Sequence, residues 1–235
     1  MPPCENCHAG CCRSFAIPVT GADLLRIERD LSLSFWEIAC RWADAEGQIA
    51  GRYVPHFFFA DEPETPFAIC LKQTESSVFP QTRRCQFLQE TPPDTQHPLG
   101  QGRCGIYASR PMACRVFPTR FSNTGPLVVL NHVPQRVLPT EDGPIYNLCG
   151  RPWEAADIDP IQGLQDLVIA KFEAEFYQQV AAAWNQHRWE WDIFPAFLQA
   201  TYEQRVVQRT SEGLASQVPP ILSIHSLPKK QRRAA

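Results

Sequence analysis

The sequence predicts an α+β protein: an irregular, cysteine-rich domain with short helices and a small sheet, followed by a C-terminal helical hairpin. All ten cysteines of the 235-residue chain lie before residue 150. The same part holds short apolar segments bounded by Pro or Gly, which are typical of strands. Residues 151–212 instead carry apolar residues at helical spacing. We therefore expect a cysteine-cluster domain over 1–150, a helical segment packed on it over 151–212 and a flexible basic tail over 213–235.

Two helix starts are marked near the N-terminus. Thr20 is followed three residues later by Asp23, and Ser34 is followed three residues later by Glu37. In each pair the hydroxyl and the carboxylate can satisfy free backbone donors of a first helical turn. The predicted helices span residues 21–32 and 35–46.

Four segments rich in aromatic or β-branched residues predict strands of a small sheet. A segment with three prolines and few apolar residues, 91–100, lies between them and predicts an exposed loop. The predicted strands are 53–59, 67–71, 116–121 and 127–133.

The C-terminal part predicts two helices. Asp159 is a good N-cap before Pro160, and apolar residues then recur every four positions from Leu164 to Trp184. A second helix is expected over 195–206. The apolar faces of such a hairpin need a partner surface, which we expect the cysteine-bearing part to supply.

Composition and charge exclude several functions. The net charge of −3 leaves no broad basic surface for phosphates, so nucleic acid is not an expected partner. The longest apolar runs, 67–71 and 180–184, are far shorter than the ~20 residues that cross a bilayer. The first residues show neither a basic nor an apolar export region, so we expect a cytoplasmic protein.

The densest motif is Cys4-Glu-Asn-Cys7-His-Ala-Gly-Cys11-Cys12. In a reducing compartment, clustered cysteines are more often metal ligands or redox groups than disulfides. Two cysteines separated by two residues can turn both sulfurs towards one metal. Gly10 is expected to form the corner of this turn. Neighbouring cysteines normally point different ways, so which of Cys11 and Cys12 is a ligand stays open.

Arginine flanks the cysteines more often than chance predicts. Of 18 arginines, five directly precede or follow a cysteine. A cation beside a thiol lowers its pKa and offsets the charge of neighbouring thiolates, as metal binding requires. These arginines are Arg13, Arg41, Arg84, Arg103 and Arg115.

Other interpretations of the motif are weaker. Residues 4–8 also spell the C-x2-C-H sequence of c-type haem attachment, but we expect no export signal and the sequence has only two methionines for an axial site, so we expect no attached haem. Cys40 and Cys70 lie in apolar surroundings and are expected to be core residues. His8 stays a candidate ligand.

The run from Cys104 through Ile106-Tyr107, Arg110-Pro111 and Cys114-Arg115 to Phe117-Pro118 resembles the YkgJ-type cysteine-cluster proteins, also described as the CxxCxxCC zinc- or iron-chelating domain. The resemblance covers residues 4–150. This chain departs from the usual pattern in having three residues between Cys7 and Cys11 and a long insertion before Cys104. The eight cysteines of the family pattern fall on Cys4, Cys7, Cys11, Cys12, Cys85, Cys104, Cys114 and Cys149.

The resemblance implies that these eight cysteines bind metal, as zinc or as an iron-sulfur cluster. Four thiolates suit both, and we favour a 4Fe-4S cluster because one knuckle plus isolated cysteines is unlike paired zinc knuckles. A flagellin lysine N-methylase is similar around its cysteines and is described as an iron-sulfur protein, which suggests a redox or methyl-transfer role. The alternative is a non-enzymatic, zinc-stabilised interaction module for a protein partner, or a metal carrier, so whether the protein is an enzyme is left open.

Overall fold

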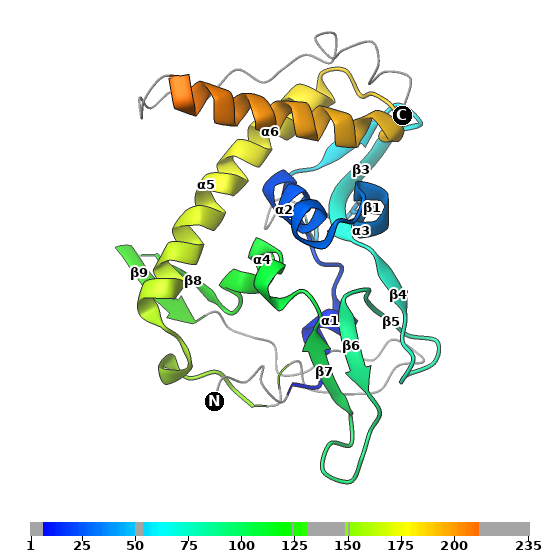
Figure 1. Ribbon diagram of the computed structural model, residues 1–235, viewed down its shortest axis with the longest axis vertical. Coiled ribbons are helices and arrows are strands. Elements are labelled where there is room, and N and C mark those ends of the chain that lie inside the picture. The colour runs from blue at the N-terminus through cyan, green and yellow to red at the C-terminus, as the bar shows by residue number, and fades with distance from the viewer. Residues whose placement is uncertain (1–6, 50–53, 124, 131–148, 150, 212–235) are drawn as a thin grey trace. The chain divides into compact units, whose positions relative to one another are not determined.

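The structure is a computed structural model that describes residues 7–49, 54–123, 125–130, 149 and 151–211 (Figure 1). Helices and small sheets are both present, so the predicted α+β class is confirmed. The chain forms two compact units, the first from Met1–Ile17 and Leu71–Lys171 and the second from Pro18–Cys70 and Phe172–Ala235. The domain boundaries expected at 150 and 212 stay predictions, and the expected tail, 213–235, lies outside the described residues.

The first unit is built from short helices and three two-stranded ribbons (Figure 1). The ribbons are β4 (Gln73–Glu75) with β5 (Arg83–Cys85), β6 (Leu88–Thr91) with β7 (Gln101–Cys104), and β8 (Thr119–Ser122) with β9 (Gly125–Leu130). The helices are α1 (Gly10–Ser14), η1 (Tyr107–Ser109), α4 (Met112–Val116), η2 (Ala155–Asp157) and the start of α5 (Pro160–Asn185).

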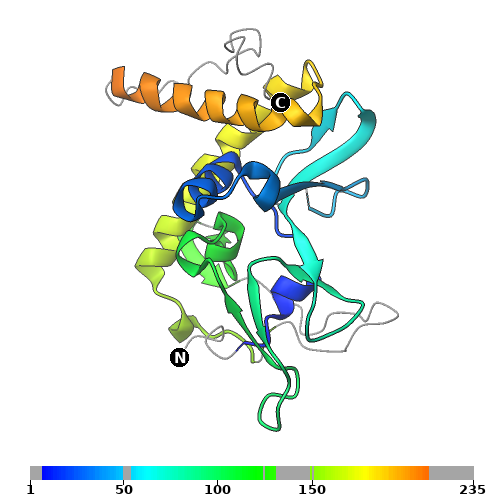
Figure 2. The same ribbon diagram turned by 45° about the vertical axis from the view of Figure 1, so that its right-hand side comes forward.

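The β-structure of this unit was predicted in part. The predicted loop, 91–100, begins one residue later than expected: residues 92–100 form the largely exposed connection of the β6–β7 hairpin, which extends well beyond α1 in both views (Figures 1 and 2). The strand expected over 116–121 begins only at Thr119, because α4 continues to Val116. β9 accounts for the last predicted strand as far as Leu130.

The second unit combines a three-stranded sheet with helices. The sheet has the order β1-β3-β2, formed by β1 (Ala39–Ala43), β3 (Glu62–Leu71) and β2 (Phe57–Phe59). Its helices are α2 (Gly21–Leu31), α3 (Phe35–Ile38), the rest of α5, η3 (Trp191–Ile193) and α6 (Phe194–Ser211). The core is aromatic: Phe57, Phe59, Trp184 and Phe194 are fully buried.

Both predicted capping boxes are confirmed, and only one of the two helices has the predicted length. Thr20 and Asp23 cap α2, which ends at Leu31. Ser34 and Glu37 cap α3, but α3 ends at Ile38 and not at residue 46. The chain enters β1 instead, where it pairs with β3. The helical spacing predicted the wrong structure here, because the segment pairs with β3 and the amide of Asp44, just after β1, donates to the carbonyl of Pro66 at 2.9 Å.

The long helix is confirmed as α5. The Asp159 side chain accepts hydrogen bonds from the amides of Ile161 and Gln162, as an N-cap should. Residues four apart are rotated by about 40° on an α-helix, so the predicted apolar row winds around α5. Its first members, such as Val168 and Phe172, are about half exposed, whereas Val180 and Trp184 are fully buried. Among the described residues, no helix is long and apolar enough to cross a bilayer.

Candidate metal centre

Cys7 lies in a tight turn that leads into α1. The amide of Ala9 donates a hydrogen bond to the Cys7 sulfur at 3.2 Å. Ala9 has a left-handed φ of 59°, so the corner of the turn is at Ala9 and not, as expected, at Gly10, which is the first residue of α1. Burial raises the pKa of the Cys7 thiol, and the Ala9 amide opposes that shift. An amide aimed at a sulfur favours its thiolate form.

Cys11 and Cys12 both lie in α1, and their sulfurs are 3.9 Å apart. The expectation that these side chains point different ways is therefore wrong. The contact between the sulfurs lowers the pKa of Cys11 and raises that of Cys12, because one thiol donates to the other. Burial and the charges of Cys11, Cys114 and Cys85 raise the pKa of Cys12 further.

Cys85 and Cys104 are brought together by the β6–β7 ribbon. Cys104 ends β7 opposite Leu88, the first residue of β6, and Cys85 ends β5 three residues earlier. The amide of Gly105 donates to the carbonyl of Phe87 at 2.8 Å and holds the turn closed. Burial, with the charges of Cys104 and Cys11, raises the pKa of Cys85 to about 11.

Cys114 and Cys149 complete the described part of the cluster. Cys114 lies in α4, three residues after Pro111, and its amide donates to the carbonyl of Pro111 at 2.9 Å. Burial raises the pKa of the Cys149 thiol, the Trp153 indole opposes the shift, and the charge of Cys11 adds to it. Both cysteines are half-buried.

Cys11 is the residue that links these thiols. Its charge raises the pKa of thiols contributed by the N-terminal turn, by α1, by β5, by β7 and by the segment before α5. These five thiols belong to Cys7, Cys12, Cys85, Cys104 and Cys149. Seven of the eight expected ligands thus belong to one charge-coupled group in the first unit, and Cys4 lies outside the described residues.

The two remaining cysteines belong to the second unit. Cys70 is completely buried in β3, and Cys40 is half-buried in the neighbouring strand β1. Burial raises the pKa of the Cys70 thiol, with smaller effects from Cys40 and Asp44. They therefore form a separate pair.

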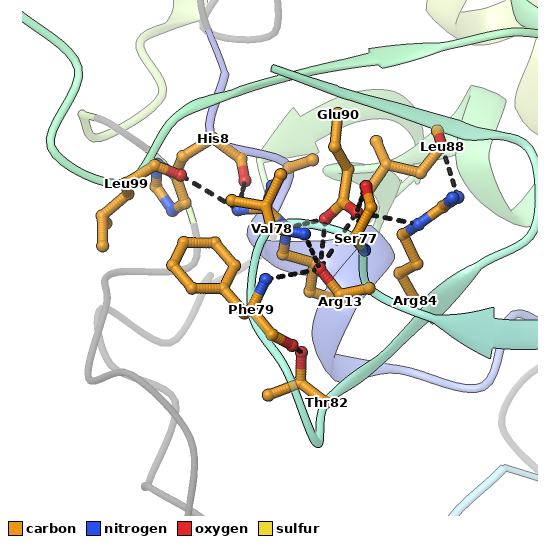
Figure 3. Close-up of polar contacts among 12 residues, drawn as sticks. His8, Arg13, Ser77, Val78, Phe79, Thr82, Arg84, Leu88, Glu90 and Leu99 are labelled. Carbon is orange, nitrogen blue, oxygen red and sulfur yellow. Dashed lines mark hydrogen bonds and ion pairs between the residues drawn. The ribbon is translucent and has the colours of Figure 1, made fainter. Parts of the chain in front are cut away.

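Sequence reasoning missed one carboxylate beside the cluster. Glu90 on β6 pairs with Arg13 and Arg84, which are the sequence neighbours of Cys12 and Cys85 (Figure 3). The two arginines had been noticed because they flank cysteines. Nothing in the sequence around Glu90 indicated that it would join them.

The donor chemistry of this group suits zinc or an iron-sulfur cluster, since both take thiolate ligands. The nine described cysteines are free thiols. In the part of the chain that the structure describes, no three His, Cys, Asp or Glu side chains are already placed around one point as metal ligands.

Comparison with known proteins gives one match. No curated protein and no solved structure matches the chain at a significant level. A family model described as "CxxCxxCC: Putative zinc- or iron-chelating domain" matches residues 3–133, which is more than half of the chain. The matched region includes every described cysteine of the charge-coupled group except Cys149. The chain therefore belongs to the CxxCxxCC family of metal-chelating domains.

Proposed function

We propose that the cysteines of the first unit hold a metal centre, with ligands drawn from Cys4, Cys7, Cys11, Cys12, Cys85, Cys104, Cys114 and Cys149, and that this centre is a 4Fe-4S cluster. The observation that carries the proposal is the gathering of cysteines from separate segments: the Cys11 and Cys12 sulfurs lie 3.9 Å apart in α1, α1 packs on β5, which ends at Cys85, and the β6–β7 ribbon brings in Cys104.

A metal explains why these thiols are gathered. Burial raises the pKa of most of them, so in the absence of a cation they keep their protons. A bound metal ion replaces those protons and neutralises the thiolates, and the free energy of binding then also stabilises the fold. The protein's own contribution is to hold the segments in place and to direct amides, such as that of Ala9, at the sulfurs.

The identity of the metal decides which chemistry is open to the protein. Zinc has no redox chemistry, so a redox role requires the iron-sulfur form. A single closely spaced cysteine pair, Cys4 and Cys7, followed by widely separated cysteines, favours the 4Fe-4S cluster over zinc. Nine described free thiols also suit a reducing compartment, and we propose the cytoplasm as the location.

The test is elemental analysis of the full chain purified without oxygen, together with its visible spectrum. We expect stoichiometric iron and acid-labile sulfide, and a broad visible absorption that bleaches on reduction. Stoichiometric zinc without visible absorption would establish the zinc form instead. A cooperatively folded protein that holds neither metal would contradict the proposal.

A non-enzymatic zinc module or metal carrier is the second candidate. Seven described thiols exceed the four that one zinc ion takes, and several of them are half-buried, so a partner protein could exchange ligands with them. A carrier would release zinc to a competing thiol protein within minutes, whereas a structural centre would retain it.

A further inference from the structure

A buried carboxylate joins two of the cysteine-bearing segments of the first unit. Glu90 on β6 has a completely buried side chain. Its oxygens lie 3.0 Å from Arg13 Nε and 2.9 Å from Arg84 Nε (Figure 3). Ser76 donates its hydroxyl at 2.9 Å, and the Ser77 amide donates at 3.1 Å. Hydrogen bonds from Arg13, Ser76 and Ser77, together with the ion pair to Arg84, therefore bring three segments together on one carboxylate.

Each arginine is also tied to the backbone around a candidate ligand. Arg13, which directly follows Cys12, donates from Nη1 to the carbonyl of His8 at 2.7 Å, next to Cys7. It also donates to the carbonyl of Leu99 at 3.2 Å, at the end of the β6–β7 connection. Arg13, just after Cys12, thus ties the end of the Cys7–Cys12 turn back to its beginning at His8.

Arg84 likewise donates hydrogen bonds to the backbone around a candidate ligand, Cys85. It directly precedes Cys85 and donates from Nη1 to the Cys85 carbonyl at 3.2 Å and to the carbonyl of Leu88. The backbone turn that carries Cys85 from β5 into β6 is therefore wrapped around this guanidinium. Glu90 is the group that Arg13 and Arg84 share, and α1 and β5 pack on each other beside it.

The charges of this cluster argue against a role in stability alone. Two guanidiniums and one carboxylate are expensive to bury, and apolar side chains of similar volume are often as stable or more so. The cluster instead fixes the geometry of the segments it joins, because each guanidinium holds its hydrogen-bond donors in one plane.

We propose that Glu90 is a positioning residue for the metal centre, which sets the thiols of α1 against Cys85 through Arg13 and Arg84. This inference rests on the proposed function. Ligands held in place before binding lose less freedom when the metal arrives, and removal of comparable outer partners typically weakens metal binding by about 10- to 100-fold.

The test uses the full chain, reduced and metal-free, and measures the affinity for Zn²⁺ alone by competition with a chromophoric chelator. Glu90→Gln keeps the shape of the side chain but replaces one acceptor oxygen with a donor. We expect Zn²⁺ to bind it about 10- to 100-fold more weakly than the wild type. The matched control is Glu173→Gln in the second unit, which removes a buried carboxylate that accepts from Arg205 at 2.8 Å and should leave the affinity unchanged.

The outcomes separate positioning from the alternatives. If the wild type binds no Zn²⁺ in this assay and holds neither iron nor zinc in the elemental analysis, the proposed metal centre is overturned together with the positioning role. If it binds and Glu90→Gln binds equally well, only the positioning role is overturned. Tighter binding by Glu90→Gln would also overturn it, since two unbalanced guanidiniums would then be favouring thiolates by charge alone.

A second variant covers the case in which Glu90→Gln does not fold. Arg84→Lys keeps the charge but loses the planar fork that spans Glu90 and the Cys85 turn. We expect a folded protein, checked by circular dichroism, with Zn²⁺ affinity reduced by a smaller factor than for Glu90→Gln. Unchanged affinity in Arg84→Lys would contradict the proposal.

Discussion

Arg115, the residue after Cys114, lies 2.9 Å from Asp166 in the first part of α5. Asp166 is almost completely buried and also accepts a hydrogen bond from Gln162 at 3.1 Å. The helix that carries Cys114 is thereby fastened to the long helix within the first unit. As with Arg13 and Arg84, an arginine beside a candidate ligand pairs with a buried carboxylate.

We expect Asp166→Asn to lower the free energy of unfolding by roughly 1 to 2 kcal/mol, since it weakens a charged hydrogen bond at a largely buried position. Urea denaturation of the reduced protein measures the change. Asp61→Asn is the control, because Asp61 pairs with Arg41 at an exposed position where such pairs are worth about 0 to 1 kcal/mol. Equal losses in the two variants would contradict the importance of burial at Asp166.

Two glycine-to-alanine substitutions should change the stability of the protein in opposite directions. A Cβ on Gly102 would lie 2.3 Å from the Cβ of Ala9, and the Gly102 amide donates to the Cys7 carbonyl at 2.7 Å. We expect Gly102→Ala to destabilise the protein by roughly 1 to 3 kcal/mol because β7 and the Cys7 turn cannot approach as closely. Thermal denaturation measures this.

Gly163→Ala is the matched comparison. Its new Cβ would meet Val128 and Ile158 at the ordinary distances of 3.4 and 3.5 Å, inside α5. We expect a gain of up to about 1 kcal/mol, because alanine is the better helix former. If Gly102→Ala instead became more stable than the wild type, the close approach of Ala9 to position 102 would not require glycine there.

The parts of the fold that depend on neighbouring residues were predictable. Thr20 and Asp159 mark the starts of α2 and α5 because a cap is formed by side chains only two or three residues away. The end of α3 was not predictable in the same way. It depends on β1 joining β3, and no local signal in the sequence around Ile38 describes that partner.

The candidate site shows the same division. The cysteine spacing and the flanking arginines indicated which residues matter for metal chemistry. The pairing of Arg13 with Glu90 joins positions 77 residues apart and could not be inferred from one sequence. The contact between Cys11 and Cys12 was also missed, because it depends on the side-chain directions in a helix of only five residues.

Below about pH 4, the free energy of unfolding should depend on the protonation of Asp157. Arg151 donates to both Asp157 oxygens, at 2.6 and 2.7 Å, and lowers the pKa of this carboxyl to about 2. Because the pKa of Asp157 is lower in the folded state than in the unfolded chain, its carboxylate stabilises the fold at pH values above the ordinary pKa near 4. This stabilisation is lost as the pH falls towards 2. We expect Arg151→Gln to return the pKa of Asp157 towards 4, measured by NMR titration of the carboxyl carbon. An unchanged pKa would show that Arg151 is not the cause.

The last prediction separates ligands from bystanders among the cysteines. Cys104 belongs to the charge-coupled group and Cys114 acts on Cys12, whereas Cys40 and Cys70 form a separate pair in the second unit. We expect Cys104→Ser and Cys114→Ser to lose metal and cooperative folding together, because the free energy of metal binding is also folding free energy.

Cys40→Ser and Cys70→Ser should retain the full metal content. Serine at the completely buried position 70 should cost about 1 to 3 kcal/mol for burying a hydroxyl, and the half-buried position 40 should cost less. Metal analysis and chemical denaturation of the four variants measure both quantities. Loss of metal from Cys70→Ser with retention in Cys104→Ser would overturn the assignment, because a thiol of the second unit would then be a ligand and a member of the coupled group would not.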